Sequence, residues 1–135
     1  MTITVDVISD VICPWCYVGK RRLEGAIRES GREVTVRWRP YQLNPTMPAE
    51  GMDRRAYRTR KFGSWERSLE LDAQLNEAAR PDGLHFAFDQ IARTPNTFDA
   101  HRVLWLAEEL GVQDGVMEAL FRAYFVDGKN IGERQ

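Results

Sequence analysis

Two cysteines, Cys13 and Cys16, stand on either side of Pro14 and Trp15 in the sequence Cys-Pro-Trp-Cys, and the chain contains no others. Two thiols at this spacing can form a disulfide with each other and give it up again through thiol–disulfide exchange. The reactive form is the thiolate, and a helix N-terminus lowers the pKa of a thiol from about 8.5 to about 3.5–7.5. The motif therefore predicts redox chemistry if Cys13 begins a helix.

The flanking residues predict the strand and the helix that such a site needs. Residues 2–9 are rich in β-branched side chains that alternate between two faces, which is typical of a strand. After the motif, apolar residues recur at helical spacing until Gly31, and Pro14 suits a first helical turn because its missing N–H costs nothing there. We therefore expect Cys13 to attack substrate disulfides and Cys16, one turn further on, to resolve the mixed disulfide.

Three other interpretations of the cysteine pair have less support. A structural disulfide that closes so short a loop contributes only about 2 kcal/mol by the chain-entropy relation. A zinc site needs two further ligands, and the only histidines, His85 and His101, lie far along the chain, so no metal site is predicted. Two inert buried cysteines would not need to follow a strand and open a helix.

The composition argues against several classes of function. The chain has 19 Lys and Arg against 20 Asp and Glu, a net charge of −1, and thus no electrostatic footprint for nucleic acid or an anionic membrane. No segment approaches the roughly 20 apolar residues of a membrane span, and residues 1–6 lack the features of a secretory signal. We therefore expect a cytoplasmic protein that binds neither nucleic acid nor membranes.

The chain after the first helix predicts one more strand and then helices. Residues 33–41 alternate as a second strand, which favours a parallel β-α-β unit with the first. Beyond the prolines of residues 43–48, Asp53 and Ser64 are placed to cap two helices. The first of these helices carries a basic run over residues 54–61. We interpret that run as a solvated face, answered by Glu66, Glu70, Asp72 and Glu77, and not as an anion site.

Aromatic and apolar residues dominate the later part of the chain. Leu84, Phe86 and Phe88 alternate, which predicts an extended connector with rings in the core and His85 facing outward. Two helices should follow, each with an apolar stripe. The predicted stripes are Ala100, Val103, Leu104, Ala107 and Leu110 in the first helix, and Val116, Leu120, Phe121, Tyr124 and Phe125 in the second.

Three short segments of sequence resemble a known family. Residues 11–19 (Val-Ile-Cys-Pro-Trp-Cys-Tyr-Val-Gly), residues 95–97 (Pro-Asn-Thr) and residues 100–102 (Ala-His-Arg) are similar to the DsbA-like thioredoxin family, especially its FrnE-type branch. The resemblance covers nearly all of the chain. It implies an α/β fold, a thioredoxin-like β-α-β unit with a large all-helical insertion, and thiol–disulfide oxidoreductase activity by Cys13 and Cys16 without a cofactor.

The resemblance also places the helix after residue 97 near the redox pair. Phe98, His101 and Arg102 are therefore expected to line a substrate groove. For His101 the residues alone favour a hydrogen-bonded structural role, and a role as catalytic base or proton shuttle stays open.

The sequence departs from the family pattern in its later part. The resemblance divides the chain into an N-terminal β-α-β part (1–42), a helical insertion (43–130) and the start of a return to the thioredoxin core (131–135). The C-terminal β-β-α half and the usual cis-proline loop are not in the sequence, because its last proline is Pro95. Either the sequence is a fragment, or another chain completes the fold, or the active site is defective. A two-stranded sheet is marginal alone, so we expect a homo-oligomer, a partner segment or a self-sufficient helical bundle.

The predicted partners are protein or small-molecule thiols and disulfides, with glutathione as a further candidate. Two other functions compete with the oxidoreductase. The kappa-class glutathione transferases and the 2-hydroxychromene-2-carboxylate isomerases resemble this chain but usually have serine at the position of Cys13. A truncated, non-catalytic binding module is the third interpretation.

Overall fold

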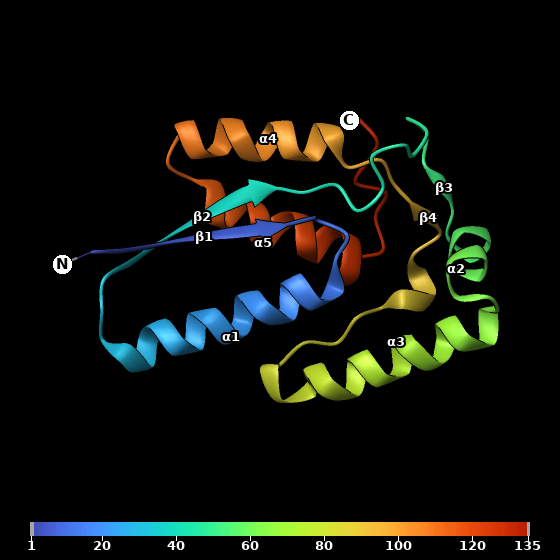
Figure 1. Ribbon diagram of the computed structural model, residues 1–135, viewed down its shortest axis with the longest axis horizontal. Coiled ribbons are helices and arrows are strands. Elements are labelled where there is room, and N and C mark those ends of the chain that lie inside the picture. The colour runs from blue at the N-terminus through green and yellow to red at the C-terminus, as the bar shows by residue number, and fades with distance from the viewer. Residues whose placement is uncertain (1, 135) are drawn as a thin grey trace.

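β1 (Ile3–Ser9) and β2 (Val34–Pro40) lie side by side as a parallel pair in the computed structural model, which describes residues 2–134 (Figure 1). Every residue of β1 pairs with the residue of β2 that follows it by 31 positions. α1 (Pro14–Ser30) makes the connection and ends at Gly31, whose φ of +64° suits a residue without a Cβ atom. The β-α-β unit predicted from the sequence is therefore confirmed.

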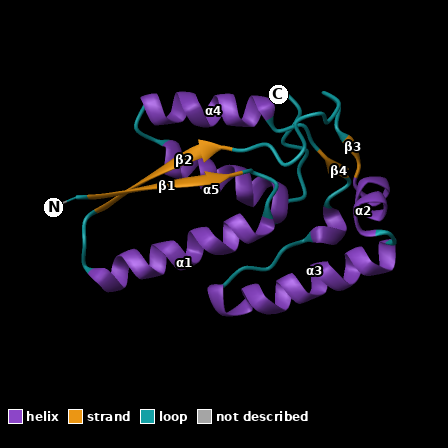
Figure 2. Ribbon diagram, in the orientation of Figure 1, coloured by secondary structure: helices purple, strands orange, loops and turns teal. Residues whose placement is uncertain are grey.

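The rest of the chain is mostly helical (Figure 2). The remaining helices are α2 (Arg54–Phe62), α3 (Trp65–Ala79), α4 (Phe98–Glu109) and α5 (Gln113–Phe125), with short 3₁₀ turns η1 (Arg80–Asp82) and η2 (Phe88–Gln90) and two short strands, β3 (Met52–Asp53) and β4 (Arg93–Thr94). Within residues 2–134, no helix is both long and apolar enough to span a membrane. Met1 and Gln135, the outermost residues of the domain bounds expected from the sequence, lie outside the described residues.

The core forms where α5 packs against both α1 and β2. The ring of Phe121 in α5 stacks on Tyr17 in α1, with centroids 4.8 Å apart, and meets Trp38 in β2 edge-on at 6.2 Å. Such aromatic pairs contribute about 0.5–1.5 kcal/mol each beyond the area they bury. The first turn of α1, which carries the redox motif, is thereby fixed against the centre of the molecule.

The connector between α3 and α4 fills the core with aromatic rings, as predicted. Phe86 and Phe88 are buried, and Phe86 meets Phe125 of α5 edge-on at 5.0 Å. The side chain of Asn76 accepts a hydrogen bond from the backbone N–H of Phe86 and donates one to its carbonyl, at 2.8 and 3.0 Å. His85 faces outward, as expected. The extended conformation ends earlier than predicted, because Phe88 begins η2.

Both predicted helix caps in the middle of the chain are confirmed. The Asp53 carboxylate accepts a hydrogen bond from the backbone N–H of Ala56 at 3.0 Å, and the Ser64 hydroxyl accepts one from Arg67 at 3.1 Å. Reasoning from the sequence missed the antiparallel pairing of β3 with β4, which joins the start of α2 to the segment before α4. Strands of two residues are too short to produce an alternating pattern.

The apolar stripe predicted for α4 needs correction. Ala100, Leu104 and Ala107 are buried, but Val103 and Leu110 are 51% and 69% exposed. The buried positions follow the i, i+4, i+7 spacing of one narrow helix face, so residues beside that face point away from the core. On the exposed side of α4, Trp105 and Leu106 also face outward.

Candidate active site

Cys13 occupies the position before the first residue of α1, as the sequence predicted. Its backbone is extended, with φ −91° and ψ 108°, and Pro14 begins the helix. The N–H of Cys13 donates to the carbonyl of Asp10 at 3.2 Å, and the N–H of Cys16 donates to the carbonyl of Cys13 at 3.1 Å. The end of β1 therefore turns directly into α1, and the turn presents both thiols at the helix N-terminus.

The two thiols affect each other's ionisation. The hydrogen bond from Cys13 lowers the pKa of Cys16 to about 6, and a hydrogen bond from the Ser9 hydroxyl acts in the same direction. The same contact, together with burial, raises the pKa of Cys13. This distribution differs from the sequence-based expectation that Cys13 itself has the lowered pKa. Because one proton is shared between the two sulfur atoms, the negative charge near neutral pH belongs to the pair.

The two cysteines face different surroundings. Cys16 packs against the core cluster, whereas Cys13, Pro14 and Trp15 line a cavity that opens beside the motif. Trp15 is 52% exposed at the edge of this cavity. Cys13 is therefore the cysteine that faces the cavity.

A buried carboxylate lies directly under the motif. Asp10 accepts hydrogen bonds from the backbone N–H groups of Val11 and Leu43, both at 2.8 Å. His101 Nε2 lies 3.0 Å from Asp10 Oδ1 and 3.1 Å from the carbonyl oxygen of Tyr41. Both partners accept, so Nε2 carries a hydrogen and donates it. His101 is thus hydrogen-bonded on the inner side of the redox loop, and its part in substrate binding or proton transfer stays a prediction.

The other two residues expected in a substrate groove lie elsewhere. Phe98 is 58% exposed, and Arg102 pairs on the surface with Asp99 at 3.1 Å. Both border a shallow hollow shared with Gln42, whereas neither lines the cavity beside Cys13. Their part in substrate binding stays a prediction.

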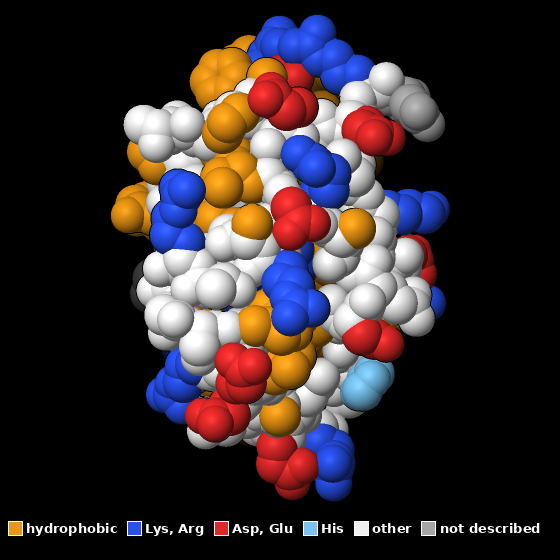
Figure 3. Space-filling model, turned by 90° about the vertical axis from the view of Figure 1, so that its right-hand side faces the viewer, with side chains coloured by type: hydrophobic (Ala, Val, Ile, Leu, Met, Phe, Trp, Pro, Cys, Tyr) orange, Lys and Arg blue, Asp and Glu red, His pale blue; other side chains and the backbone are white. Residues whose placement is uncertain are grey.

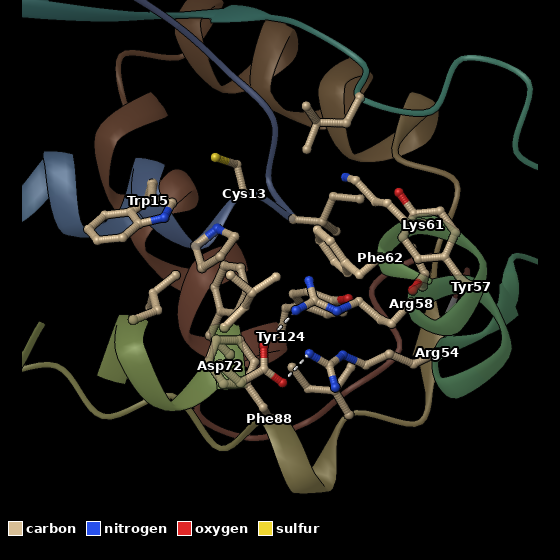
Figure 4. A pocket seen from close by; sticks show the side chains of 18 of the residues that line it. Cys13, Trp15, Arg54, Tyr57, Arg58, Lys61, Phe62, Asp72, Phe88 and Tyr124 are labelled. Carbon is tan, nitrogen blue, oxygen red and sulfur yellow. Dashed lines mark hydrogen bonds and ion pairs between the residues drawn. The ribbon is translucent and has the colours of Figure 1, made fainter. Parts of the chain in front are cut away.

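The cavity beside Cys13 has a volume of about 330 Å³ and was missed from the sequence. α1 contributes one wall, and Tyr57, Arg58, Lys61 and Phe62 of α2 lie across the cavity from Cys13 (Figure 4). Besides Trp15 and Phe62, its apolar lining residues are Ile12, Pro14, Leu43, Leu71, Leu75, Phe88, Ile91 and Phe125. The volume is at the small end of the range for ligand sites, about 300–1,000 Å³.

Two arginines of the basic run point into this region, Arg54 fully buried and Arg58 partly buried. Arg54 Nη2 lies 2.9 Å from Asp72 Oδ2, and Arg58 Nη2 lies 2.7 Å from Asp72 Oδ1. Arg58 also donates to the Ser68 hydroxyl at 2.8 Å. Asp72 thus pairs with arginines of the basic run, as expected. The two arginines point inward, however, so the run is not only a solvated helix face.

A second charged cluster fixes α1 against α5. Glu118 of α5 accepts hydrogen bonds from Tyr17 at 2.6 Å, from Arg21 at 2.6 Å and from Lys20 at 2.9 Å. The bonds from Arg21, followed by those from Tyr17 and Lys20, lower the pKa of Glu118 to about 2. The cluster holds the helix that carries the motif at a second point.

Comparison with known families gives a match over residues 4–135 to the DSBA-like thioredoxin domain. The chain belongs to this family. The thioredoxin-like fold expected from the motif is thereby confirmed. In residues 2–134 no three His, Cys, Asp or Glu side chains gather as a metal site would require.

Three individual proteins are similar to the chain over most of its length. The uncharacterized protein YwbO of Bacillus subtilis (strain 168) is 29% identical over 133 residues, which cover 98% of this chain and 62% of YwbO. A probable DsbA oxidoreductase from Streptomyces coelicolor is 32% identical with a TM-score of 0.82, over 97% of this chain and 58% of that one. A provisionally assigned protein disulfide isomerase from Nitrosomonas europaea, 18% identical with a TM-score of 0.61 over 98% of this chain and 60% of its own, shares the fold. The chain therefore spans less than two thirds of these relatives.

Proposed function

We propose that this DsbA-like domain is a thiol–disulfide oxidoreductase with Cys13 and Cys16 as its redox pair. The observation that carries the proposal is the position of both cysteines at the N-terminus of α1, with Cys13 lining a cavity, and a pKa of Cys16 lowered to about 6 agrees with it. At neutral pH the pair therefore holds a thiolate, which is the nucleophile of disulfide exchange.

The proposed reaction proceeds in two exchanges. The Cys13 sulfur attacks one sulfur of a substrate disulfide, forms a mixed disulfide and releases the other half as a thiolate. The Cys16 sulfur then attacks Cys13, forms the Cys13–Cys16 disulfide and releases the remaining half. The protein dithiol loses two electrons and the substrate disulfide gains them. Of the two released thiolates, one takes the proton that the thiol pair carries at neutral pH and the other takes a proton from water. The reverse sequence oxidises a substrate dithiol.

The order of the two cysteines rests on access. Cys13 lines the cavity, while Cys16 packs on the core. Transfer of the shared proton from Cys13 to Cys16 places the negative charge on the sulfur that a substrate can reach.

Reduction of insulin disulfides by dithiothreitol, with and without the protein, tests the activity. We expect the wild-type protein to accelerate the reaction and the Cys13→Ser/Cys16→Ser double variant to have no effect. The matched control is Ser30→Ala, at the far end of α1. Equal rates with the wild type and the double variant would refute the proposal.

The same preparation tests the glutathione-dependent alternative. A transferase or isomerase would bind glutathione tightly and would turn over an electrophile without reducing or oxidising disulfides. The presence of cysteine at both motif positions, Cys13 and Cys16, favours the oxidoreductase instead. Membership of the FrnE-type branch and a cytoplasmic location are further parts of the proposal, supported by the motif and the composition.

A further inference from the structure

The cavity beside Cys13 combines an apolar floor with an excess of positive charge. Arg54, Arg58 and Lys61 line it, and Asp72 is the one carboxylate among its lining residues. Both oxygens of Asp72 are used by the two arginines. Two guanidinium groups therefore share one carboxylate, which leaves one positive charge unbalanced. Burial and the neighbouring Arg54 also lower the pKa of Arg58 despite Asp72.

Lys61 is the cation in this cavity without an ion-pair partner in residues 2–134. Its ammonium nitrogen lies 5.7 Å from the ring centre of Tyr57 and 5.6 Å from that of Phe62, both of which line the same cavity. The side chain extends from α2 on the side of the cavity opposite Cys13 (Figure 4). A charge held over aromatic rings at the edge of an apolar hollow is available to a ligand.

The positive charge is local to the cavity. On the face that includes α2, Lys and Arg side chains alternate with acidic and hydrophobic ones, and they form no continuous basic surface (Figure 3). A long polyanion would therefore find only scattered contacts. A small ligand that enters the cavity would pass Lys61 at the edge and reach the apolar side chains inside.

We propose that this cavity binds one half of a small-molecule disulfide that has an apolar, ring-sized body and a carboxylate, with the carboxylate at Lys61 and the sulfur at Cys13. This rests on the proposed function and specifies its substrate class. The volume of about 330 Å³ limits the occupant to a small molecule. Charge complementarity selects a carboxylate over a neutral or cationic group.

The reaction at this site is the exchange described above. Cys13 forms a disulfide with the half that occupies the cavity, the other half leaves as a thiolate, and attack by Cys16 releases the bound half. Lys61 takes no part in bond making. It raises the rate by favouring the encounter and by orienting the carboxylate-bearing half.

Two aromatic disulfides of similar size can distinguish carboxylate binding by Lys61 from a general effect of Lys61 on the reactivity of the thiols. The probes are 5,5′-dithiobis(2-nitrobenzoate), whose halves each carry a carboxylate, and the uncharged 2,2′-dithiodipyridine. The reduced protein is mixed with each at neutral pH, and the second-order rate constant is measured from the released thiol. The test variant is Lys61→Gln, and Arg60→Gln is the matched control. Arg60 is the preceding residue of α2 and does not line the cavity, so its substitution removes one positive charge outside the site.

We expect Lys61→Gln to slow the reaction with the carboxylate-bearing disulfide about three- to ten-fold and to leave the rate with the neutral disulfide unchanged. Lys61→Arg should restore most of the rate, and Arg60→Gln should change neither rate by more than about 1.5-fold. If Lys61→Gln slowed the reactions with both disulfides equally, the substitution would act on the reactivity of the thiols. If Lys61→Gln and Arg60→Gln slowed the reaction with the carboxylate-bearing disulfide equally, the effect would come from the net charge of the protein and not from a contact in the cavity. Either result overturns the proposal.

Failure of the proposed oxidoreductase function would give a different result from failure of the proposed role of Lys61. A wild-type protein that releases two thiols from 2,2′-dithiodipyridine in a Cys13-dependent reaction retains oxidoreductase chemistry, whatever Lys61 contributes. If Cys13→Ser reacted as fast as the wild type with both probes, the proposed function itself would fail.

Discussion

His101 Nε2 lies 3.0 Å from Asp10 Oδ1, and the two side chains are 8% and 1% exposed. The pair connects α4 to the loop that precedes Cys13, across 91 positions of sequence. The Asp10 carboxylate also accepts two backbone N–H groups, so the contact fixes the loop from which α1 begins. A buried polar network thus fixes the loop that precedes the redox motif.

Removal of the histidine should destabilise the protein. His101→Ala leaves the Asp10 carboxylate without one donor and opens a cavity, and we expect the free energy of unfolding to fall by about 2–4 kcal/mol. Urea denaturation measures the change. Glu109→Ala, an exposed substitution on the same helix, should cost less than about 0.5 kcal/mol. Equal effects of the two substitutions would mean that the buried contact contributes nothing.

The thiol pair should ionise near pH 6. Absorbance of the thiolate at 240 nm, followed against pH in the reduced protein, should rise with a midpoint of about 6. Cys13→Ala removes the hydrogen bond to Cys16, so the pKa of Cys16 should move up toward the ordinary thiol value of about 8.5. Ser9→Ala, which removes a lesser donor, should produce a smaller upward shift. A midpoint that stays near 6 in Cys13→Ala would exclude the hydrogen bond as its cause.

Glu118 should make stability depend on pH in the acid range. Its pKa is lowered to about 2 in the folded protein from an ordinary value of 4.5, because Arg21, Tyr17 and Lys20 donate to the carboxylate. A lowered carboxyl pKa stabilises the folded state above pH 4.5, and that contribution is lost as the pH falls from about 4.5 to about 2.

Glu118→Gln should therefore lose stability at pH 7 and show a smaller further loss between pH 5 and pH 2 than the wild type. Thermal unfolding at a series of pH values provides the measurement. Glu29→Gln, exposed at the end of α1, should keep the wild-type slope. If Glu118→Gln also kept that slope, the cluster between α1 and α5 would not be the source of the acid sensitivity.

The exposed side of α4 should mediate self-association. β1 has a hydrogen-bonded neighbour on one side only within residues 2–134, and Trp105 on α4 is 64% exposed. Exposed strand edges and apolar patches favour pairing between chains. Sedimentation equilibrium at tens of micromolar should show a dimer that Trp105→Glu weakens at least about ten-fold. Leu69→Glu, which alters a 49% exposed residue on α3, should have no such effect. A strictly monomeric, well-folded wild type would contradict the prediction.

Local patterns were sufficient to predict the elements that carry the motif. The alternation in β1 and β2, the proline at the start of α1 and the caps at Asp53 and Ser64 all depend on residues within a few positions of one another. These signals are short-range, and tertiary packing reinforced them here.

The chemistry of the site depends on longer-range contacts, which the sequence revealed only in part, since it offered Asp72 as one of four acidic partners for the basic run. Asp72 meets Arg54 and Arg58 from the next helix, and Glu118 meets Arg21 from 97 positions away. No periodic pattern in the sequence indicates which acidic residue pairs with which arginine. The shift of negative charge toward Cys16 likewise depends on the hydrogen bond between the two side chains, which spacing alone does not define.

The most direct test of the proposed mechanism is to trap the mixed disulfide. Reduced Cys16→Ser and Cys13→Ser variants are each mixed with 2,2′-dithiodipyridine for a short time, quenched with acid and analysed by intact-protein mass spectrometry. Because Cys13 faces the cavity and Cys16 packs on the core, we predict rapid, stable addition of one thiopyridyl group to Cys16→Ser and slow addition to Cys13→Ser. Faster addition to Cys13→Ser would contradict the assignment of Cys13 as the attacking thiol.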